Sequence, residues 1–151
     1  MPRAAGDGNA SVRVVVDTNT LVPGLLWSGP PHQLLNAVRE RRITLYSSTA
    51  LVAELAEVLA REQFSRRLRS ANVSAIELLS DSAQLARLVI PAEIGPTVTG
   101  DPDDDQVLAC ALAAEAQVIV SGDKRLRNLK TYQRMPIVGA GEALAMIQQA
   151  T

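Results

Sequence analysis

The chain has 151 residues, of which 47% are hydrophobic and 3% are aromatic. This length predicts a single domain that buries its own core without disulfides or a structural metal. The only cysteine, Cys110, excludes an internal disulfide framework and a zinc cluster built on thiolates. A formal net charge of −1 excludes a strongly basic nucleic-acid binder, and the scarcity of aromatic rings argues against a base-stacking platform.

The sequence shows neither a membrane span nor a secretory signal. No apolar run approaches the roughly 18 residues that a span needs, and residues 1–11 lack the apolar centre of a signal peptide. We therefore expect residues 1–11 to be a flexible tail and residues 12–151 to form one domain. A lone cysteine fits a reducing compartment, so we expect the protein to be cytoplasmic, with no membrane partner.

The first third of the domain alternates between strand and helix patterns. A β-branched run predicts a buried strand over residues 12–16. Prolines and glycines predict a loop over residues 23–31, and a helix is expected from about 31 to 42. A short strand over residues 43–46 precedes a helix over about 49–62, which has a continuous apolar stripe.

The alternation continues to the end of the chain. Residues 63–88 are expected to hold one short and one longer helix, and residues 89–90 a short strand that ends at a proline. The remaining elements are a helix over 101–116, a strand over 117–120, a strand over 137–138 and a helix over 141–150. This order predicts an α/β domain with a mainly parallel sheet of four to five strands. Such sheets place ligand sites at the carboxyl ends of their strands.

Two aspartates lie at the exits of predicted strands. Asp17 comes after the first strand, and Asp123 follows the strand over 117–120. Both therefore belong to the carboxyl edge of the sheet. Glu54 lies beside the apolar stripe of the helix over 49–62.

An acidic run opens the helix over 101–116. At 100° per residue, Asp104 falls on the core side of this helix and Asp105 at the border of the apolar stripe. Asp103 projects away from the stripe. Asp101 fits the N-cap position, because Pro102 suits the first helical position.

These carboxylates predict a metal site if they converge. Asp17, Glu54, Asp104 and Asp123, with Asp105 as an alternative or additional member, would repel one another unless a cation lay between them. Oxygen ligands without histidine or cysteine suit Mg²⁺ or Mn²⁺, and such sites hydrolyse phosphodiesters. The competing interpretation is ordinary turn residues, an acidic first helical turn and a solvated Glu54.

The order of these motifs resembles PIN-domain nucleases. The opening Val-Val-Val-Asp17-Thr-Asn19, continuing to Trp27-Ser-Gly, is similar to the branch assigned to toxins of bacterial toxin–antitoxin systems. The other matching segments follow in the expected order: Ser47-Ser48 through Glu54-Leu55, Val58-Leu59, Asp101-Pro-Asp-Asp-Asp105 and Val120-Ser-Gly-Asp123-Lys. The resemblance spans about residues 12–148.

The resemblance implies a metal-dependent ribonuclease of three-layer α/β/α architecture. It implies that acidic residues hold one or two Mg²⁺ or Mn²⁺ ions, at the positions of Asp17, Glu54, Asp104 (or Asp105) and Asp123. Polar positions that support such a pocket match Asn19 and Ser121. The implied partners are an RNA substrate, an antitoxin protein and a second copy of the chain.

Basic residues are candidates for contacts with RNA. The segment after Asp123 carries Lys124, Arg125, Arg127 and Lys130. They would hold the RNA backbone beside the acidic site, although a solvated loop explains them equally well. A second group, Arg61, Arg66, Arg67 and Arg69 around Phe64, would bind RNA or an antitoxin, or form a surface helix.

Three single residues and three rival functions remain open. His32 fits a helix start and Cys110 a core position, whereas Trp27 would cover the acidic pocket or a dimer interface. The rival functions are a phosphatase that uses Asp17 as its nucleophile, a receiver-like signalling module and a non-catalytic PIN-like binding module. The phosphatase usually needs a second aspartate at position 19, which is Asn here.

Overall fold

The computed structural model describes residues 11–98 and 101–150. The tail expected at residues 1–11 lies outside the described residues except for Ser11, whose hydroxyl lies 2.6 Å from that of Thr44. No helix in the described ranges has both the length and the apolar character that crossing a membrane would require.

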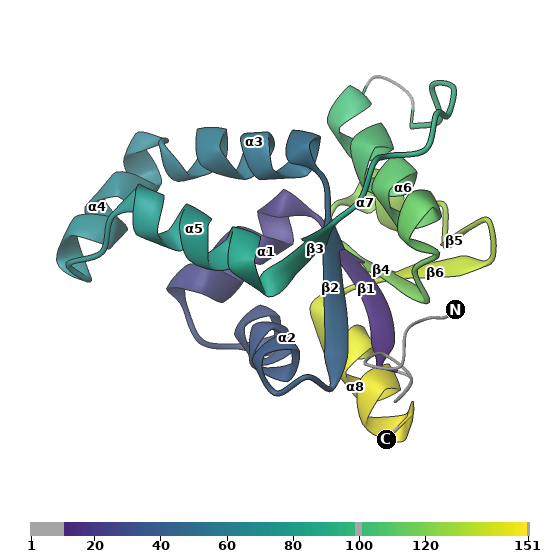
Figure 1. Ribbon diagram of the computed structural model, residues 1–151, viewed down its shortest axis with the longest axis horizontal. Helices are drawn as coiled ribbons and strands as arrows, with labels where there is room; N and C mark the ends of the chain where they lie inside the picture. The colour runs from purple at the N-terminus through teal and green to yellow at the C-terminus, as the bar shows by residue number, and fades with distance from the viewer. Residues whose placement is uncertain (1–10, 99–100, 151) are drawn as a thin grey trace.

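A six-stranded sheet in the order β3-β2-β1-β4-β6-β5 forms the centre of the molecule (Figure 1). All neighbouring strands are parallel except β5 and β6. This confirms the expected α/β class with a mainly parallel sheet. The strands are β1 (Val12–Val16), β2 (Ile43–Ser47), β3 (Ala86–Leu88), β4 (Val118–Val120), β5 (Thr131–Tyr132) and β6 (Met135–Val138).

The sheet has more strands than the expected four to five because it includes a hairpin that no sequence pattern predicted. β5 pairs with β6 through a turn at Gln133 and Arg134, whose φ angles are 49° and 70°. Such turns usually carry Asn or Gly, which tolerate positive φ. Neither residue type is present here, so composition gave no turn signal.

Helices cover both faces of the sheet, as the three-layer expectation requires. Alternate strand residues point to opposite faces: Val14 packs with α2 (Pro30–Arg39) and α8 (Ala140–Ala150), and Val15 packs with α6 (Pro102–Ala114). A third apolar cluster joins the remaining longer helices (Figure 1): α1 (Thr18–Leu26), α3 (Thr49–Leu59), α4 (Glu62–Ser70) and α5 (Ala75–Leu85).

The expected loop over residues 23–31 is wrong at its start, because α1 runs through Pro23 and Gly24. Gly24 serves helix packing: a Cβ there would lie 2.9 Å from the Pro31 carbonyl oxygen. The glycine therefore lets α1 and α2 approach closely. In the sequence, a glycine that is required for helix packing looks the same as a glycine in a loop.

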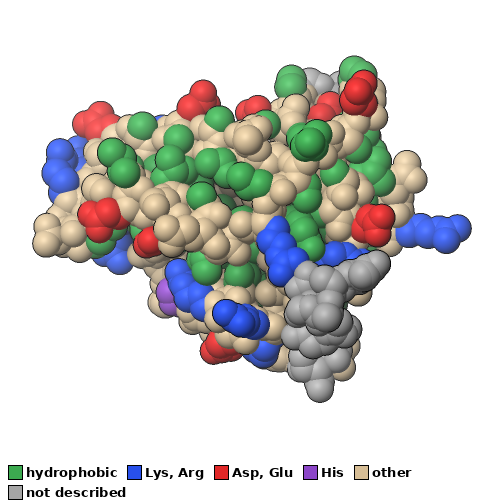
Figure 2. All heavy atoms as spheres, viewed as in Figure 1, with side chains coloured by type: hydrophobic (Ala, Val, Ile, Leu, Met, Phe, Trp, Pro, Cys, Tyr) green, Lys and Arg blue, Asp and Glu red, His purple; other side chains and the backbone are tan. Residues whose placement is uncertain are grey.

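Two further boundaries differ from expectation. β3 occupies Ala86–Leu88 instead of 89–90, because pairing with β2 selects Ala86 as the partner of Leu45. The basic segment after Asp123 forms a short helix, α7 (Lys124–Arg127), where a loop was one of the two interpretations. Figure 2 shows hydrophobic side chains gathered on the face that carries α3, α5 and β3.

The arrangement of β1 and β4 positions the acidic residues. The two strands are adjacent and parallel, and Val16 is the register partner of Val120. The chain therefore leaves both strands at the same edge, and the Asp17 N–H donates to the Val120 carbonyl at 3.0 Å.

Candidate metal centre

Asp17 is a buried carboxylate with fixed hydrogen bonds. It caps α1, and its Oδ1 accepts the backbone N–H of Thr20 at 2.9 Å while its Oδ2 accepts the Ser121 hydroxyl. The side chain is only 4% exposed. Burial raises its pKa; the hydrogen bonds from Ser121 and Thr20 oppose this, and the charge of Asp123 adds to it.

Three carboxylates converge beside this edge. Asp101, Asp104 and Asp123 each offer one oxygen, and these three oxygens lie within 4.8 Å of one another. Asp104 is 7% exposed, as its core-side position on α6 predicts, and its Oδ2 has no hydrogen-bond partner among the described residues. Burial raises the pKa of Asp104 to about 8, with further contributions from Asp123 and then Asp101.

Ser121 links the two strand-exit aspartates. Its hydroxyl donates to Asp17 and accepts the backbone N–H of Asp123 at 2.9 Å. Ser121 is fully buried, so its contact with Asp17 is shielded from water, and its contact with Asp123 is part-buried. Asp123 in turn caps α7, where its Oδ1 accepts the Arg125 N–H at 2.8 Å.

Glu54 lies at the border of the acidic group. It is half-buried on α3, and its Oε1 accepts the Thr18 hydroxyl at 2.8 Å. Burial raises its pKa, the Thr18 hydrogen bond opposes the rise, and the charges of Asp103, Asp17 and Asp101 increase it. The negative charges of the acidic residues therefore also act on Glu54, although Glu54 lies outside the group formed by Asp101, Asp104 and Asp123.

Asp105 and Asn19 do not join the acidic group. The Asp105 carboxylate accepts the N–H groups of Thr97 and Val98, the latter at 2.7 Å, and so ties a loop to the start of α6. Asn19 is exposed, and no hydrogen bond within the described residues joins it to a carboxylate. Of the two aspartates left open by the resemblance, the geometry favours Asp104.

A family model of the PIN domain matches residues 13–125. The chain belongs to the PIN-domain family. Membership in this family indicates a metal-dependent nuclease, and the matched region contains every carboxylate described above. No curated protein matches the chain.

The donors of this PIN domain fit a divalent cation. A carboxylate that is 93% buried needs a partner for each oxygen, and the free Asp104 Oδ2 lies beside two further carboxylates, while the nearby Arg125 guanidinium pairs with Asp101. The donors are all carboxylate oxygens, which hard cations prefer. The geometry fits a metal held by Asp101, Asp104 and Asp123, with Asp17 and Glu54 beside it.

Sequence reasoning missed three contributors to this centre. Asp101 was interpreted only as an N-cap, although a cap three residues before Asp104 stands at the same end of the helix. Thr18 and Thr20 flank Asn19, and they, instead of Asn19, make the hydrogen bonds to Glu54 and Asp17. Thr18 and Thr20 are buried and Asn19 is exposed. Residues two apart in a helix lie about 200° apart around its axis, so helical periodicity did not mark this pair.

The basic residues after Asp123 divide between two roles. Arg125 Nη1 pairs with Asp101 Oδ2 at 3.1 Å. Lys124, Arg127 and Lys130 instead line an open hollow of about 530 Å³, together with Asn128 and Glu142.

The other candidate residues have structural roles. The His32 ring bonds the Gly24 carbonyl at 2.9 Å, and Cys110 is fully buried with its pKa raised by burial to about 12. Trp27 is the C-cap of α1, about 15 Å along the helix from Asp17 at its N-cap, so it does not cover the acidic group. It packs instead against Phe64 and under the guanidinium of Arg67.

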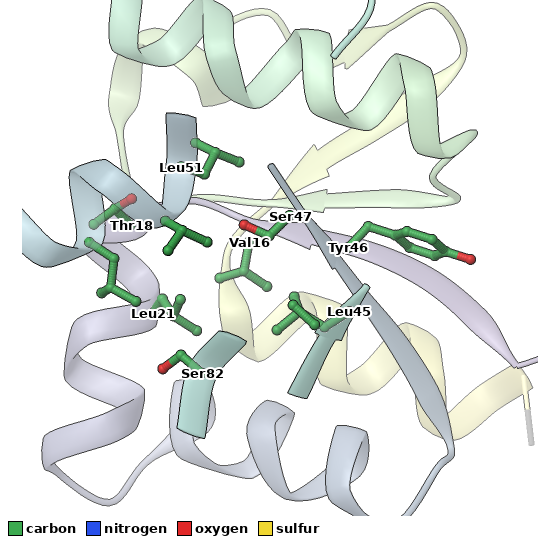
Figure 3. Close-up of a pocket in the computed structure, with 11 residues that line it drawn as sticks. Val16, Thr18, Leu21, Leu45, Tyr46, Ser47, Leu51 and Ser82 are labelled. Carbon is green, nitrogen blue, oxygen red and sulfur yellow. The ribbon is translucent and has the colours of Figure 1, made fainter. Parts of the chain in front are cut away.

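A small cavity lies behind Thr18, between the ends of β1 and β2 and the helices α1, α3 and α5 (Figure 3). Its volume is about 20 Å³, and its polar lining comes from Thr18, Ser47 and Ser82. One water fits such a space but a nucleotide does not. This cavity is therefore not a nucleotide site, and none of the acidic residues described above lines it.

Proposed function

We propose that this PIN domain is an endoribonuclease that hydrolyses RNA with Mg²⁺ or Mn²⁺. The observation that carries this proposal is the buried, unpartnered Oδ2 of Asp104 beside Asp101 and Asp123. A PIN-domain chain with this arrangement has the parts of a metal-dependent nuclease.

The chain's own residues have distinct tasks in this mechanism. Asp101, Asp104 and Asp123 would hold the cation, which would supply an activated water and neutralise the phosphate. Ser121 holds Asp17 and Asp123 in one orientation, and Thr18 orients Glu54.

The rival phosphatase mechanism fits the geometry poorly. Both carboxylate oxygens of Asp17 accept hydrogen bonds, and the side chain is 4% exposed. A carboxylate held in this way is a weak nucleophile and is poorly accessible to a phosphoryl group. Asp17 is therefore better suited to supporting the metal centre than to acting as a covalent nucleophile.

The hollow beside α7 supports a path for the RNA backbone. Lys124, Arg127 and Lys130 place three cations around it, and Lys124 follows Asp123 directly. Contacts from these residues would position a phosphodiester beside the acidic centre without reading its bases. The proposal of RNA over DNA rests on the resemblance to the toxin branch of the family.

We also propose a toxin role, with an antitoxin partner, a homodimer and a cytoplasmic location. Arg66 and Arg69 on α4 and Arg61 at its N-cap are exposed and offer charge complementarity to an acidic antitoxin segment. Leu88, at the end of the edge strand β3, is 52% exposed, and Ile90, two residues after the strand, is 89% exposed. These exposed apolar side chains support the proposal that a second copy of the chain covers them.

The test compares RNA and DNA oligonucleotides of one sequence. Protein freed of metal by chelation should cleave RNA only after Mg²⁺ or Mn²⁺ is restored, and Asp104→Asn should not cleave. Cleavage that survives chelation would overturn the metal mechanism, and equal cleavage of DNA would overturn the preference for RNA. Metal binding without any cleavage would favour the non-catalytic module.

A further inference from the structure

We propose that Asp101 is a ligand of the metal centre and that Arg125 competes with the metal for its carboxylate. In the metal-free protein Arg125 holds Asp101; metal binding releases the guanidinium toward the substrate phosphate. This proposal rests on the metal centre of the proposed function.

The two oxygens of Asp101 have different tasks. Oδ1 accepts the N–H groups of Asp103 and Asp104 at 3.1 and 3.2 Å, which caps α6. Oδ2 takes no part in the cap, and the Arg125 guanidinium donates to it at 3.1 Å. The oxygen that remains for a metal is therefore the one that Arg125 occupies.

The unpartnered oxygen of Asp104 shows that Arg125 does not complete the site. Arg125 pairs with Asp101 but leaves Asp104 Oδ2 buried and without a partner among the described residues. One guanidinium faces three carboxylates, so the group keeps negative charge that a divalent cation would neutralise. The lack of a partner for Asp104 Oδ2 is therefore evidence for a missing ligand, and this evidence does not depend on the clustering of the three acids.

Arg125 is attached in a way that allows exchange. Its backbone N–H donates to Asp123 Oδ1 at 2.8 Å, which fixes the start of its side chain at the acidic group. The side chain itself is 60% exposed, so the guanidinium can turn without disturbing the core. A cation on Asp101 would repel it, and a phosphate bound at the centre would attract it, since guanidinium binds phosphate in a bidentate manner.

The alternative is a plain structural ion pair that braces α6 against α7. The two interpretations predict opposite effects on metal affinity. A bracing pair organises the site, so its loss would weaken metal binding. A competing pair occupies the site, so its loss would strengthen metal binding.

Calorimetric titration of the full chain with Mn²⁺, without substrate, separates them. We expect Arg125→Ala to lower the Kd for Mn²⁺ by about two- to tenfold, the range for loss of one partly exposed opposing charge. Arg127→Ala is the matched control, because it removes one positive charge from the same helix without a contact to Asp101; its effect should be smaller. Unchanged or weaker metal binding in Arg125→Ala would overturn the proposal.

Asp101→Asn tests the ligand itself. Asn caps helices about as well as Asp, so α6 should remain folded while the charged ligand is lost. We expect metal affinity to fall by about tenfold or more. In this background Arg125→Ala should no longer strengthen metal binding. Undiminished Mn²⁺ affinity in Asp101→Asn would overturn the assignment of Asp101.

A second readout follows the released guanidinium. In Ca²⁺, fluorescence anisotropy of a labelled RNA should show weaker binding to Arg125→Ala even though its metal site is filled more readily. RNA binding equal to that of the wild type would overturn the substrate role of Arg125. The outcomes are distinguishable from failure of the nuclease proposal: a wild type that binds Mn²⁺ with these effects but leaves RNA intact would refute only the nuclease. A wild type that binds no Mn²⁺ would refute both.

Discussion

The Ser121 hydroxyl, just after β4, donates a hydrogen bond to Asp17, just after β1. The two residues are 104 positions apart in the sequence. Both side chains are buried, so the contact is not weakened by water. It fixes the Asp17 carboxylate at the edge where the acidic residues gather, and it depends on the register of the two strands.

Ser121→Ala should weaken both metal binding and the fold. The change removes the donor to Asp17 and the acceptor for the Asp123 N–H, and it leaves a buried carboxylate oxygen and a part-buried N–H without these partners. We expect a loss of about 1–3 kcal/mol in the free energy of unfolding. Urea denaturation measures this loss, and calorimetry measures the metal affinity. Ser121→Thr, which keeps the hydroxyl, is the control, and the alanine variant should be worse than it in both measurements.

The metal-free protein should become less stable as the pH rises from about 4 to about 8. The folded state keeps a proton on Asp104, whose pKa is raised to about 8, whereas the unfolded chain has lost it. Stability therefore falls by at most about 1.4 kcal/mol per pH unit over this range. Asp17 and Glu54, whose pKa values are also raised, act in the same direction. Thermal melts across this range, with Asp104→Asn as the flatter control, measure the effect.

Metal binding at neutral pH should release a proton. A cation that binds Asp104 displaces the proton that its raised pKa retains. We expect Mn²⁺ affinity to rise with pH up to about pH 8. Titrations in two buffers of different ionisation enthalpy count the protons; equal apparent enthalpies in both buffers would contradict the protonated state of Asp104.

Asp104→Asn and Asp105→Asn should separate chemistry from stability. Asp104→Asn should abolish metal-dependent cleavage and leave the fold intact, because the amide is neutral at this buried position, as the protonated carboxyl is in the metal-free protein. Asp105→Asn should retain cleavage and lose about 1.5–3 kcal/mol of stability, since its carboxylate holds the N–H groups of Thr97 and Val98. Cleavage assays and urea denaturation of both variants check this. The reverse pattern would make Asp105 the metal ligand.

Gly24→Ala should destabilise the domain without changing the chemistry. The added Cβ would lie 2.9 Å from the Pro31 carbonyl oxygen and 3.2 Å from Leu35, where α1 meets α2. We expect a loss of about 1–3 kcal/mol in the free energy of unfolding. Gly141→Ala is the matched control: it lies in α8, where an added Cβ meets nothing within 4 Å, so it should be neutral or slightly stabilising.

Lys124 and Lys130 should contribute to the salt dependence of RNA binding. If both contact phosphates at the hollow beside α7, replacing the pair with alanine should reduce the slope of log K against log salt by about 1.4 in magnitude. Anisotropy titrations at several salt concentrations measure the slope. The control replaces Arg61 and Arg66 on α4, and a larger change in that control would place the RNA over α4 instead.

Much of the acidic site was readable in the sequence because its signals are local. Asp17 and Asp123 follow β-branched runs, and parallel strands bring their carboxyl ends to one edge. The helical wheel of α6 placed Asp104 on the core side, and its 7% exposure agrees. These inferences need only the periodicity of strands and helices and the parallel order of the sheet.

The tertiary structure decided what depends on distant partners. Asp105 does not join the acidic group, because its carboxylate accepts hydrogen bonds from the backbone N–H groups of Thr97 and Val98 in the preceding loop. The pairing of Asp101 with Arg125 joins residues 24 positions apart, because the start of α6 and the start of α7 meet at the acidic group. The periodicity of apolar residues in the sequence does not predict such contacts, because they depend on which segments the fold places side by side.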